Sequence, residues 1–256
     1  MKIFYFTATG NSLYTAKRFG GELYSIPKVL KSNELSYEDN EKIGIIFPCY
    51  ALSAPGIVRE FIEKVTLKSP YIFAILTYGN KVANGVGWFT EYAKKNNINI
   101  HYANSLLMID NYLPFFDIEQ QKLKSKNIEE NLNSLLIDVS ENKKYIQKGS
   151  LVDSFITNGA QGLINVAPNL IFVKDFSINN KCNGCGTCTK VCPKGNISIN
   201  KELKNSKPIY GDTCESCLAC INLCPQKAIN IKRDKNPNAR FKNENISIKE
   251  IIDSNS

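Results

Sequence analysis

Long hydrophobic runs, the mark of a membrane-spanning helix, are missing from this chain of 256 residues. No uninterrupted apolar stretch approaches the length of about 20 residues that such a helix needs. The apolar run at the start, residues 3–6, is too short for a signal peptide. These absences predict a cytoplasmic protein without a membrane span.

Several patterns of nucleotide and nucleic-acid binding are also missing. The chain contains neither G-x-x-x-x-G-K-[S/T] nor a complete G-x-G-x-x-G, the two common glycine-rich phosphate loops. Its net charge of +8 is not gathered into any block of five consecutive basic residues, so we expect no nucleic-acid partner. His101, the only histidine, has no partner motif and is assigned no catalytic role.

Cysteine, by contrast, is abundant, and eight of the nine cysteines form two copies of one pattern. Each copy reads C-x-x-C-x-x-C-x-x-x-C-P, and the second follows the first by 32 positions. Ile197 and Ile199 correspond in the same way to Ile229 and Ile231, an alternating pair typical of a short strand. The repeat predicts two similar halves packed face to face. The cysteines are Cys182, Cys185, Cys188 and Cys192 in the first copy and Cys214, Cys217, Cys220 and Cys224 in the second.

Three thiolates at spacings of three residues can surround one side of a cubic iron-sulfur cluster, and a more distant cysteine then completes the ligand set. A zinc ribbon is one alternative, but zinc sites usually show two separated C-x-x-C pairs. A disulfide framework is another, but clustered cysteines in a chain that looks intracellular point to a metal instead. The pattern therefore favours iron-sulfur clusters.

With these motifs, residues 174–232 resemble the bacterial two-cluster ferredoxins. The resemblance implies two 4Fe-4S clusters that pass single electrons, and it implies that each cluster borrows its fourth ligand from the other copy. One cluster would then be held by Cys182, Cys185, Cys188 and Cys224, and the other by Cys214, Cys217, Cys220 and Cys192.

The beginning of the chain reads as a strand over residues 2–6, a hydroxyl-rich turn, and a helix that extends to Phe19. Backbone N–H groups at such a helix start, with nearby hydroxyls, can cradle a phosphate, and Gly10 allows close approach of the backbone. The alternative is an ordinary helix cap. The turn consists of Thr7, Ala8, Thr9, Gly10, Asn11 and Ser12.

This turn resembles the flavodoxin loop that binds the phosphate of FMN, and the resemblance extends over residues 1–148. It implies an α/β domain with a doubly wound, five-stranded parallel sheet in the order 2-1-3-4-5. Apolar strands and helices alternate as this fold requires. We expect strands at residues 43–47 and 71–77 and within 98–109, and helices at 53–65 and 87–95.

Ligands of such a sheet bind beyond the carboxyl ends of the strands, so the loops 7–12, 48–53 and 77–85 should meet the flavin. Tyr50 is the first candidate to stack on the flavin ring and Tyr78 the second, although either ring could simply cover the sheet edge. Cys49 is expected to be a small packing residue rather than a reactive thiol. The flavin candidates in the second and third loops are Pro48, Cys49, Tyr50, Ala51, Thr77, Tyr78, Gly79 and Asn80.

The remaining segments join these parts. Asp117 and Gln120 form a capping box that should open one long helix, with a buried stripe at Leu132, Leu135, Leu136 and Val139. The apolar run 112–116 is either a lid over the flavin or a hydrophobic cover. Residues 149–173 should be a packed connector, and the tail 233–256 should carry a short docked helix that begins at a capping box, residues 247–250.

Together the two resemblances match fused flavodoxin-ferredoxin proteins, in which a C-terminal α+β two-cluster domain follows the flavodoxin-like domain. They imply electron transfer among FMN, two clusters and a redox partner protein. An FMN-dependent reductase of a small acceptor, fed by its own clusters, is the alternative, and a redox sensor is a third class. An electron carrier is favoured over an enzyme because no substrate domain is recognisable.

Overall fold

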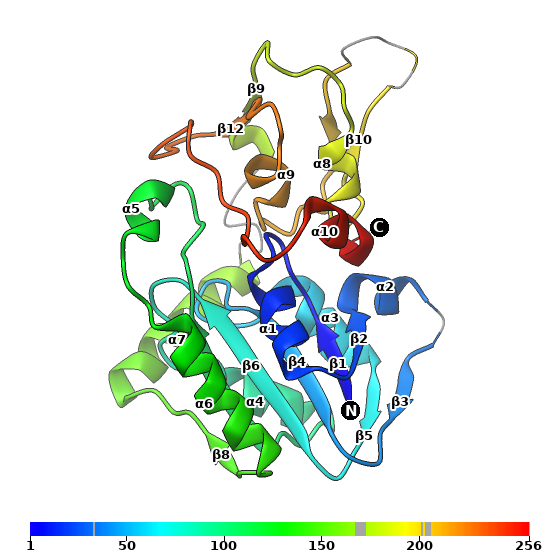
Figure 1. Cartoon of the computed structure of the whole chain (residues 1–256), viewed down its shortest axis with the longest axis vertical. Coiled ribbons are helices and arrows are strands. Elements are labelled where there is room, and N and C mark those ends of the chain that lie inside the picture. Colours follow the sequence, from blue (N-terminus) through cyan, green and yellow to red (C-terminus); the bar gives the residue numbers. More distant parts are fainter. Residues whose placement is uncertain (33, 167–172, 201, 203–205, 256) are drawn as a thin grey trace. The chain divides into compact units, whose positions relative to one another are not determined.

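The computed structural model describes the whole chain except residues 33, 167–172, 201, 203–205 and 256, and the side chains of residues 163–173 are also left undescribed (Figure 1). The described chain divides into two compact units. The first unit comprises Met1–Thr7, Asn11–Met108 and Lys126–Pro168, and the second comprises Ala8–Gly10, Ile109–Ser125 and Asn169–Ser256. Both units therefore combine segments that are distant in sequence.

A parallel β-sheet forms the centre of the first unit, which confirms the mixed α/β class. Its strands lie in the order β2-β1-β4-β6-β7-β8, and every neighbouring pair is parallel. The sheet has one strand more than predicted, because Tyr145 and Ile146 pair with β7. The strands are β1 (Lys2–Tyr5), β2 (Glu22–Ser25), β4 (Ile43–Pro48), β6 (Ile72–Tyr78), β7 (Tyr102–Leu107) and β8 (Tyr145–Ile146).

Helices lie on both faces of this sheet, with α1 and α6 on one face and α4 on the other (Figure 1). Buried aromatic rings fill the interfaces, as in the Phe47–Phe89 pair with ring centroids 4.5 Å apart. A small parallel pair of strands, β3 (Ser36–Glu38) and β5 (Thr66–Lys68), stands outside the main sheet. The helices of this unit are α1 (Asn11–Phe19), α2 (Ile26–Lys31), α3 (Gly56–Lys64), α4 (Gly85–Lys95), α6 (Ile128–Ser140) and α7 (Leu151–Val166).

The prediction of one long helix after Asp117 is wrong, because the chain forms two helices there. Asp117 caps α5 (Ile118–Lys122) by accepting a hydrogen bond from the Glu119 N–H at 2.9 Å, as expected of a cap. Asn127 then adopts a left-handed conformation, with φ of 46°, and starts α6 as a separate helix. Of the predicted stripe, Leu132, Leu135 and Val139 are buried on α6, whereas Leu136 is only half-buried.

The connector contains the helix α7, whose inward face is polar. Thr157 and Gln161 are buried, whereas Leu151, Val152 and Phe155 are 91%, 67% and 81% exposed. The predicted apolar connector residues 163, 164, 166, 168 and 170 fall outside the described side chains. Among the described residues, no helix has the length and apolar character needed to cross a bilayer.

The 32-residue repeat organises the second unit. Its two halves are joined by exchanged strands: β9 (Phe176–Ile178) precedes the first cysteine motif but pairs with β12 (Ile229–Ile231), which follows the second. Correspondingly, β10 (Ile197–Ser198) follows the first motif and pairs with β11 (Ile209–Tyr210), which precedes the second. The short helices α8 (Thr187–Lys190) and α9 (Ala219–Asn222) also correspond, and the 3-10 turn η1 (Val173–Asp175) leads into β9.

Segments from elsewhere in the chain complete the core of this unit. Leu113 and Ile118 are 1% and 0% exposed and belong to the same buried cluster as Ile197, Ile229 and Phe241. Leu113, within the run 112–116 predicted to be a lid or a cover, is therefore a core residue. At the other end, α10 (Ile248–Asn255) begins at the predicted capping box, in which the Glu250 N–H donates to Ser247 Oγ and the Ser247 N–H donates to Glu250 Oε2.

Candidate functional site

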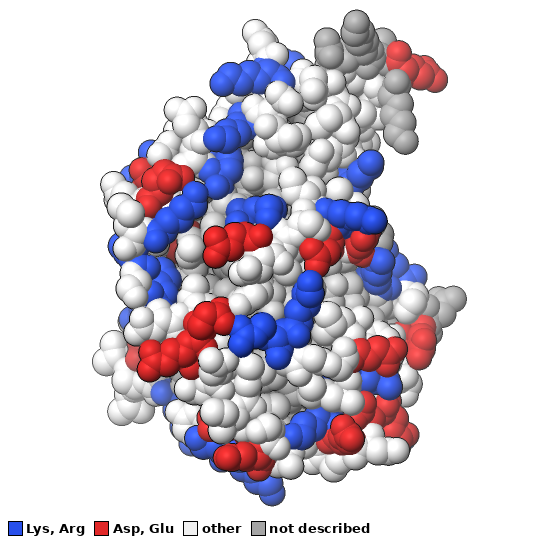
Figure 2. Space-filling view, in the orientation of Figure 1, with Lys and Arg blue, Asp and Glu red and all other residues white. Residues whose placement is uncertain are grey.

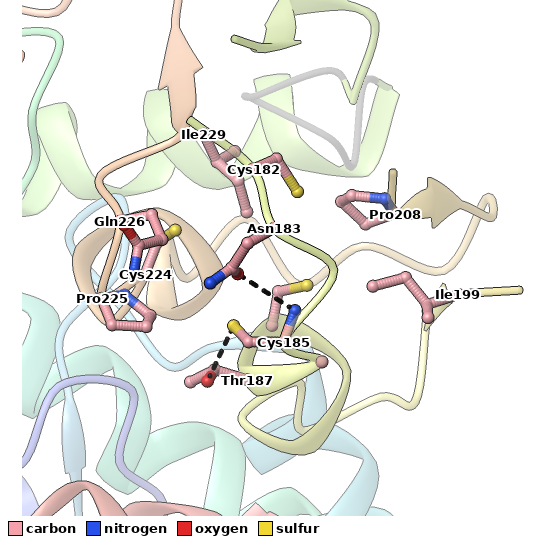
Figure 3. Close-up of a pocket in the computed structure, with 12 residues that line it drawn as sticks. Cys182, Asn183, Cys185, Thr187, Ile199, Pro208, Cys224, Pro225, Gln226 and Ile229 are labelled. Carbon is pink, nitrogen blue, oxygen red and sulfur yellow. Dashed lines mark hydrogen bonds between the residues drawn. The ribbon is translucent and has the colours of Figure 1, made fainter. Parts of the chain in front are cut away.

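Four cysteines from both copies of the motif line one pocket of the second unit (Figure 3). Cys182 and Cys185 come from the loop that leads into α8, and Cys188 lies in α8 itself. Cys224 comes from the end of the second copy, just after α9, and it is the second copy's only cysteine in the lining of this pocket. The pocket therefore assembles three consecutive cysteines with the fourth cysteine of the other copy.

The exchanged strands explain this arrangement. Pairing of β9 with β12 places Ile178 opposite Ile229, five residues after Cys224. The Asn179 N–H also donates to the Ala228 carbonyl, with a nitrogen-to-oxygen distance of 2.9 Å. The antiparallel pair thus places the residues just before the first motif next to the residues just after the second motif.

The other four cysteines form a second group. The thiols of Cys214, Cys217 and Cys220 each lie within electrostatic reach of Cys192, the last cysteine of the first copy. Among the described residues, no three His, Cys, Asp or Glu side chains meet as the ligands of a single metal ion would. The cysteines of the first group instead line one pocket, an arrangement compatible with a polynuclear cluster.

Hydrogen bonds to sulfur repeat together with the motif. The Asn196 N–H donates to Cys192 Sγ, and 32 residues later the Ala228 N–H donates to Cys224 Sγ, both at 3.3 Å. The Cys185 sulfur lies 3.4 Å from the Thr187 hydroxyl (Figure 3). Such donors stabilise negative charge on sulfur and hold it in position for a metal.

Burial controls the protonation of the free thiols. It raises the pKa of Cys188 to about 11, and the negative charges of the neighbouring Cys185 and Cys224 add to this shift. Burial likewise raises the pKa of Cys214, Cys217 and Cys220. Deprotonation of these thiols therefore depends on a bound cation, since metal binding to cysteine displaces the proton.

The fold of the repeat and the grouping of its cysteines fit a ferredoxin-like iron-sulfur domain. Residues 181–228 match the family model of the 4Fe-4S dicluster domain. The chain thus carries a ferredoxin-like iron-sulfur domain, which supports a role in electron transfer. The comparison with curated proteins gave no match.

The first unit presents loops at the carboxyl ends of three neighbouring strands, β1, β4 and β6. The Ser12 hydroxyl, at the start of α1, lies 2.8 Å from the hydroxyl of Thr77 near the end of β6, and both residues are buried. Two buried hydroxyls beside a helix start are suitable donors for a phosphate oxygen. This part of the predicted cradle fits the chemistry of an FMN phosphate.

The middle of the predicted phosphate loop packs against the chain's own tail. The Asn243 N–H donates to the Thr9 carbonyl at 2.8 Å, and Asn111 donates to the Thr9 hydroxyl at 2.6 Å. Gly10 has φ of 104°, and a Cβ placed on it would lie 2.9 Å from the Cβ of Asn243 and 3.1 Å from that of Ile246. The side of Gly10 on which a Cβ would lie is therefore occupied by the chain's own side chains.

The loop after β4 contains a tight turn that the sequence did not reveal. Tyr50 and Ser53 exchange backbone hydrogen bonds of 2.9 and 3.0 Å across Ala51 and Leu52. Ala51 and Leu52 have φ of 45° and 63°, a left-handed conformation that costs roughly 1–2 kcal/mol for each non-glycine residue. The turn contains no glycine, so nothing in the sequence indicated its left-handed conformation.

Two polar side chains hold this strained turn. Gln161 donates to the Ala51 carbonyl at 3.0 Å and accepts a hydrogen bond from Arg59 at 2.6 Å. Arg59 also donates to the Ser53 hydroxyl at 2.8 Å. The buried polar face of α7 therefore positions the loop that carries Tyr50.

The other flavin candidates are placed as follows. Tyr50 is half-buried, and its ring lies edge-on to that of Phe6 with 6.3 Å between the ring centroids. Burial raises the pKa of Cys49 to about 12, as expected of an unreactive thiol. Tyr78 is half-buried and Asn80 is exposed. The Gly79 carbonyl accepts a hydrogen bond from Lys126 Nζ at 2.8 Å, an interaction that sequence reasoning missed.

His101 has a structural position. Its Nδ1 accepts a hydrogen bond from the Ile72 N–H at 3.1 Å, at the start of β6. Burial, followed by the charge of Lys144, lowers the pKa of this imidazole. A neutral ring that accepts from the backbone suits a residue that orders the end of a strand.

Proposed function

We propose that the protein transfers single electrons through two 4Fe-4S clusters, one held by Cys182, Cys185, Cys188 and Cys224 and the other by Cys214, Cys217, Cys220 and Cys192. The observation that carries this proposal is the pocket that Cys224 shares with the first three cysteines of the other copy. Each set provides the four thiolates that a cubic cluster takes.

The clusters supply the redox chemistry, and the protein supplies position and charge control. Eight thiolates fix the two sites, while backbone N–H groups such as those of Asn196 and Ala228 offset part of the negative charge. Buried isoleucines pack in the same cluster as Cys188 and Cys220. The protein can then accept and release electrons without a large rearrangement.

We further propose that FMN binds at the carboxyl edge of the parallel sheet of a flavodoxin-like domain, residues 1–148, and exchanges electrons with the clusters of a ferredoxin domain, residues 174–232. Ser12 and Thr77 are the side chains best suited to hold the phosphate, and Tyr50 is the candidate to stack on the ring. FMN handles one or two electrons, so it would link two-electron donors to the one-electron clusters.

A redox partner protein would deliver or remove the electrons. Figure 2 shows Lys and Arg side chains interspersed with Asp and Glu side chains over the visible face. Two clusters, each with a charge of about −2 including its four thiolates, would lower the formal charge of +8 to about +4. This balance favours a protein partner over a nucleic acid.

The proposal is tested by cofactor counts on protein purified without oxygen. We expect about eight irons and one FMN per chain, with the broad visible absorption of 4Fe-4S clusters superimposed on flavin bands. A count of about four irons would contradict the second cluster, and protein without flavin after incubation with excess FMN would contradict the flavin site.

Replacement of Ser12 by alanine should weaken FMN binding about tenfold, because it removes one charge-assisted hydrogen bond to the phosphate, worth about 1.4 kcal/mol. The matched control is Thr15→Ala on the same helix, since the Thr15 hydroxyl is engaged with the Asn11 carbonyl at 3.1 Å. Dissociation constants follow from the quenching of flavin fluorescence. Equal constants for the two variants would remove Ser12 from the phosphate site.

An FMN-dependent reductase of a small acceptor is the second candidate function. The strained turn at Ala51 and Leu52 favours it, because backbone strain is often retained at reacting sites. Anaerobic assays with quinones, nitro compounds and free flavins distinguish the two functions. Saturable turnover of one acceptor would establish an enzyme, whereas uniformly slow, unsaturated reduction of all of them fits a carrier.

A further inference from the structure

One tyrosine hydroxyl is buried beside the cysteines without a hydrogen-bond partner. Tyr210 lies on β11, opposite Ile197 of β10, while its neighbour Ile209 is 64% exposed. The Tyr210 side chain therefore turns inward, where it packs edge-on against Phe176 with ring centroids 5.5 Å apart. Its hydroxyl is fully buried, and no hydrogen bond to it is found among the described residues.

Sulfur atoms are the neighbours of this hydroxyl. It lies beside the thiol of Cys220 and within electrostatic reach of Cys188 and Cys214. These thiols belong to both cysteine groups, because Cys188 lines the pocket with Cys224 whereas Cys220 and Cys214 group with Cys192. A buried hydroxyl needs a hydrogen-bond partner, and the Cys220 sulfur can serve as that partner.

The internal repeat shows that this hydroxyl is present in only one half. Tyr210 pairs with Ile197, and 32 residues earlier Ile178 pairs in the same way with Ile229. The equivalent position in the other half is therefore aliphatic and offers no donor. The two cysteine groups differ at this point by one O–H.

We propose that the Tyr210 hydroxyl donates a hydrogen bond to a sulfur of the cluster held by Cys214, Cys217, Cys220 and Cys192, and makes that cluster the easier of the two to reduce. This inference rests on the two-cluster function proposed above. A reduced cluster carries one more negative charge than an oxidised one, so a donor to sulfur stabilises the reduced state more. An electron that enters the protein then resides on the Cys220 side.

The test is Tyr210→Phe, which removes the hydroxyl and keeps the ring. The two clusters are titrated with dithionite under anaerobic conditions and followed by the EPR signals of the reduced state. We expect one of the two midpoint potentials to fall by about 59 mV, a tenfold change in a one-electron equilibrium constant, while the other stays constant. Tyr112→Phe is the matched control. Tyr112 packs against the same core, but the pKa of its hydroxyl is raised by burial alone and no cysteine contributes.

Iron counts separate the two ways in which this idea can fail. If wild-type protein holds about four irons, the two-cluster function itself is wrong. If wild-type and Tyr210→Phe proteins both hold about eight irons and their midpoint potentials coincide, the hydrogen bond is refuted while the two clusters stand. A fall of both potentials by the same amount would also overturn the proposal, since it would show a general change of environment.

Discussion

A protein with Cys182 and Cys224 both replaced by alanine is expected to keep one complete cluster, whereas a protein with Cys182 and Cys192 replaced should keep none. The reason is the shared pocket of Cys182, Cys185, Cys188 and Cys224. The first pair of substitutions removes two ligands from one crossed set and leaves Cys192 with Cys214, Cys217 and Cys220. The second pair leaves both sets with three cysteines.

The two variants are matched, because each loses two cysteines and one of these is Cys182. EPR of the dithionite-reduced proteins measures the result: about one reduced 4Fe-4S signal per chain for the first variant and none for the second. If each motif instead held its own cluster, the second variant would retain the signal and the first would lose it. Neither iron content nor colour alone can distinguish the two variants, since three cysteines can hold an incomplete cluster.

Replacement of Arg240 by alanine should destabilise the second unit by about 3–5 kcal/mol, because it leaves a buried carboxylate unpaired. Arg240 Nη1 lies 3.1 Å from Asp234 Oδ2, and the two side chains are only 5% and 2% exposed. Arg240 also donates to the carbonyls of Ala239 at 2.8 Å and Ile229 at 3.3 Å. It therefore joins the loop after β12 to β12 itself.

The measurement is the urea concentration at which the visible absorption of the clusters is lost under anaerobic conditions. Lys122→Ala is the control within the same unit, since Lys122 and Glu119 form an exposed pair at 3.0 Å that contributes at most about 1 kcal/mol. Asp234→Ala added to Arg240→Ala should recover part of the loss, because the unpaired charge is then gone. An equal effect of the Arg240 and Lys122 substitutions would show that the buried pair contributes little.

The cysteine pattern predicted the iron-sulfur module well because ligand spacing is a local property of the chain. The backbone conformation of the repeat was harder to predict from the sequence. Gly184, Gly186 and Gly195 have positive φ, and so do their counterparts 32 residues later, which are Ser216, Leu218 and Lys227. Glycine marks these turns in the first copy, whereas in the second only the repeat itself reveals them.

The parallel sheet was predictable for a similar reason, since buried parallel strands are continuous apolar runs. The broken helix was not, because Asn127 is compatible with a helix interior and its left-handed conformation depends on where α5 and α6 pack. Leu113 and Ile118 were recognisable as apolar, but hydrophobicity does not specify which core a residue joins. Their place in the cluster with Ile229 is a property of the folded chain.

The interleaving of the two units has a consequence for biosynthesis. A ribosome releases the chain from its amino terminus, so the parallel strands of the first unit emerge early. The second unit must wait, because its core needs Leu113 from the middle of the chain together with Phe241 and Ile251 from near its end. The Gly10 loop meets Asn243 and Ile246, which are translated much later. Assembly of the second unit thus requires segments that are translated at widely separated times, and neither unit can be exchanged between proteins as one uninterrupted gene segment.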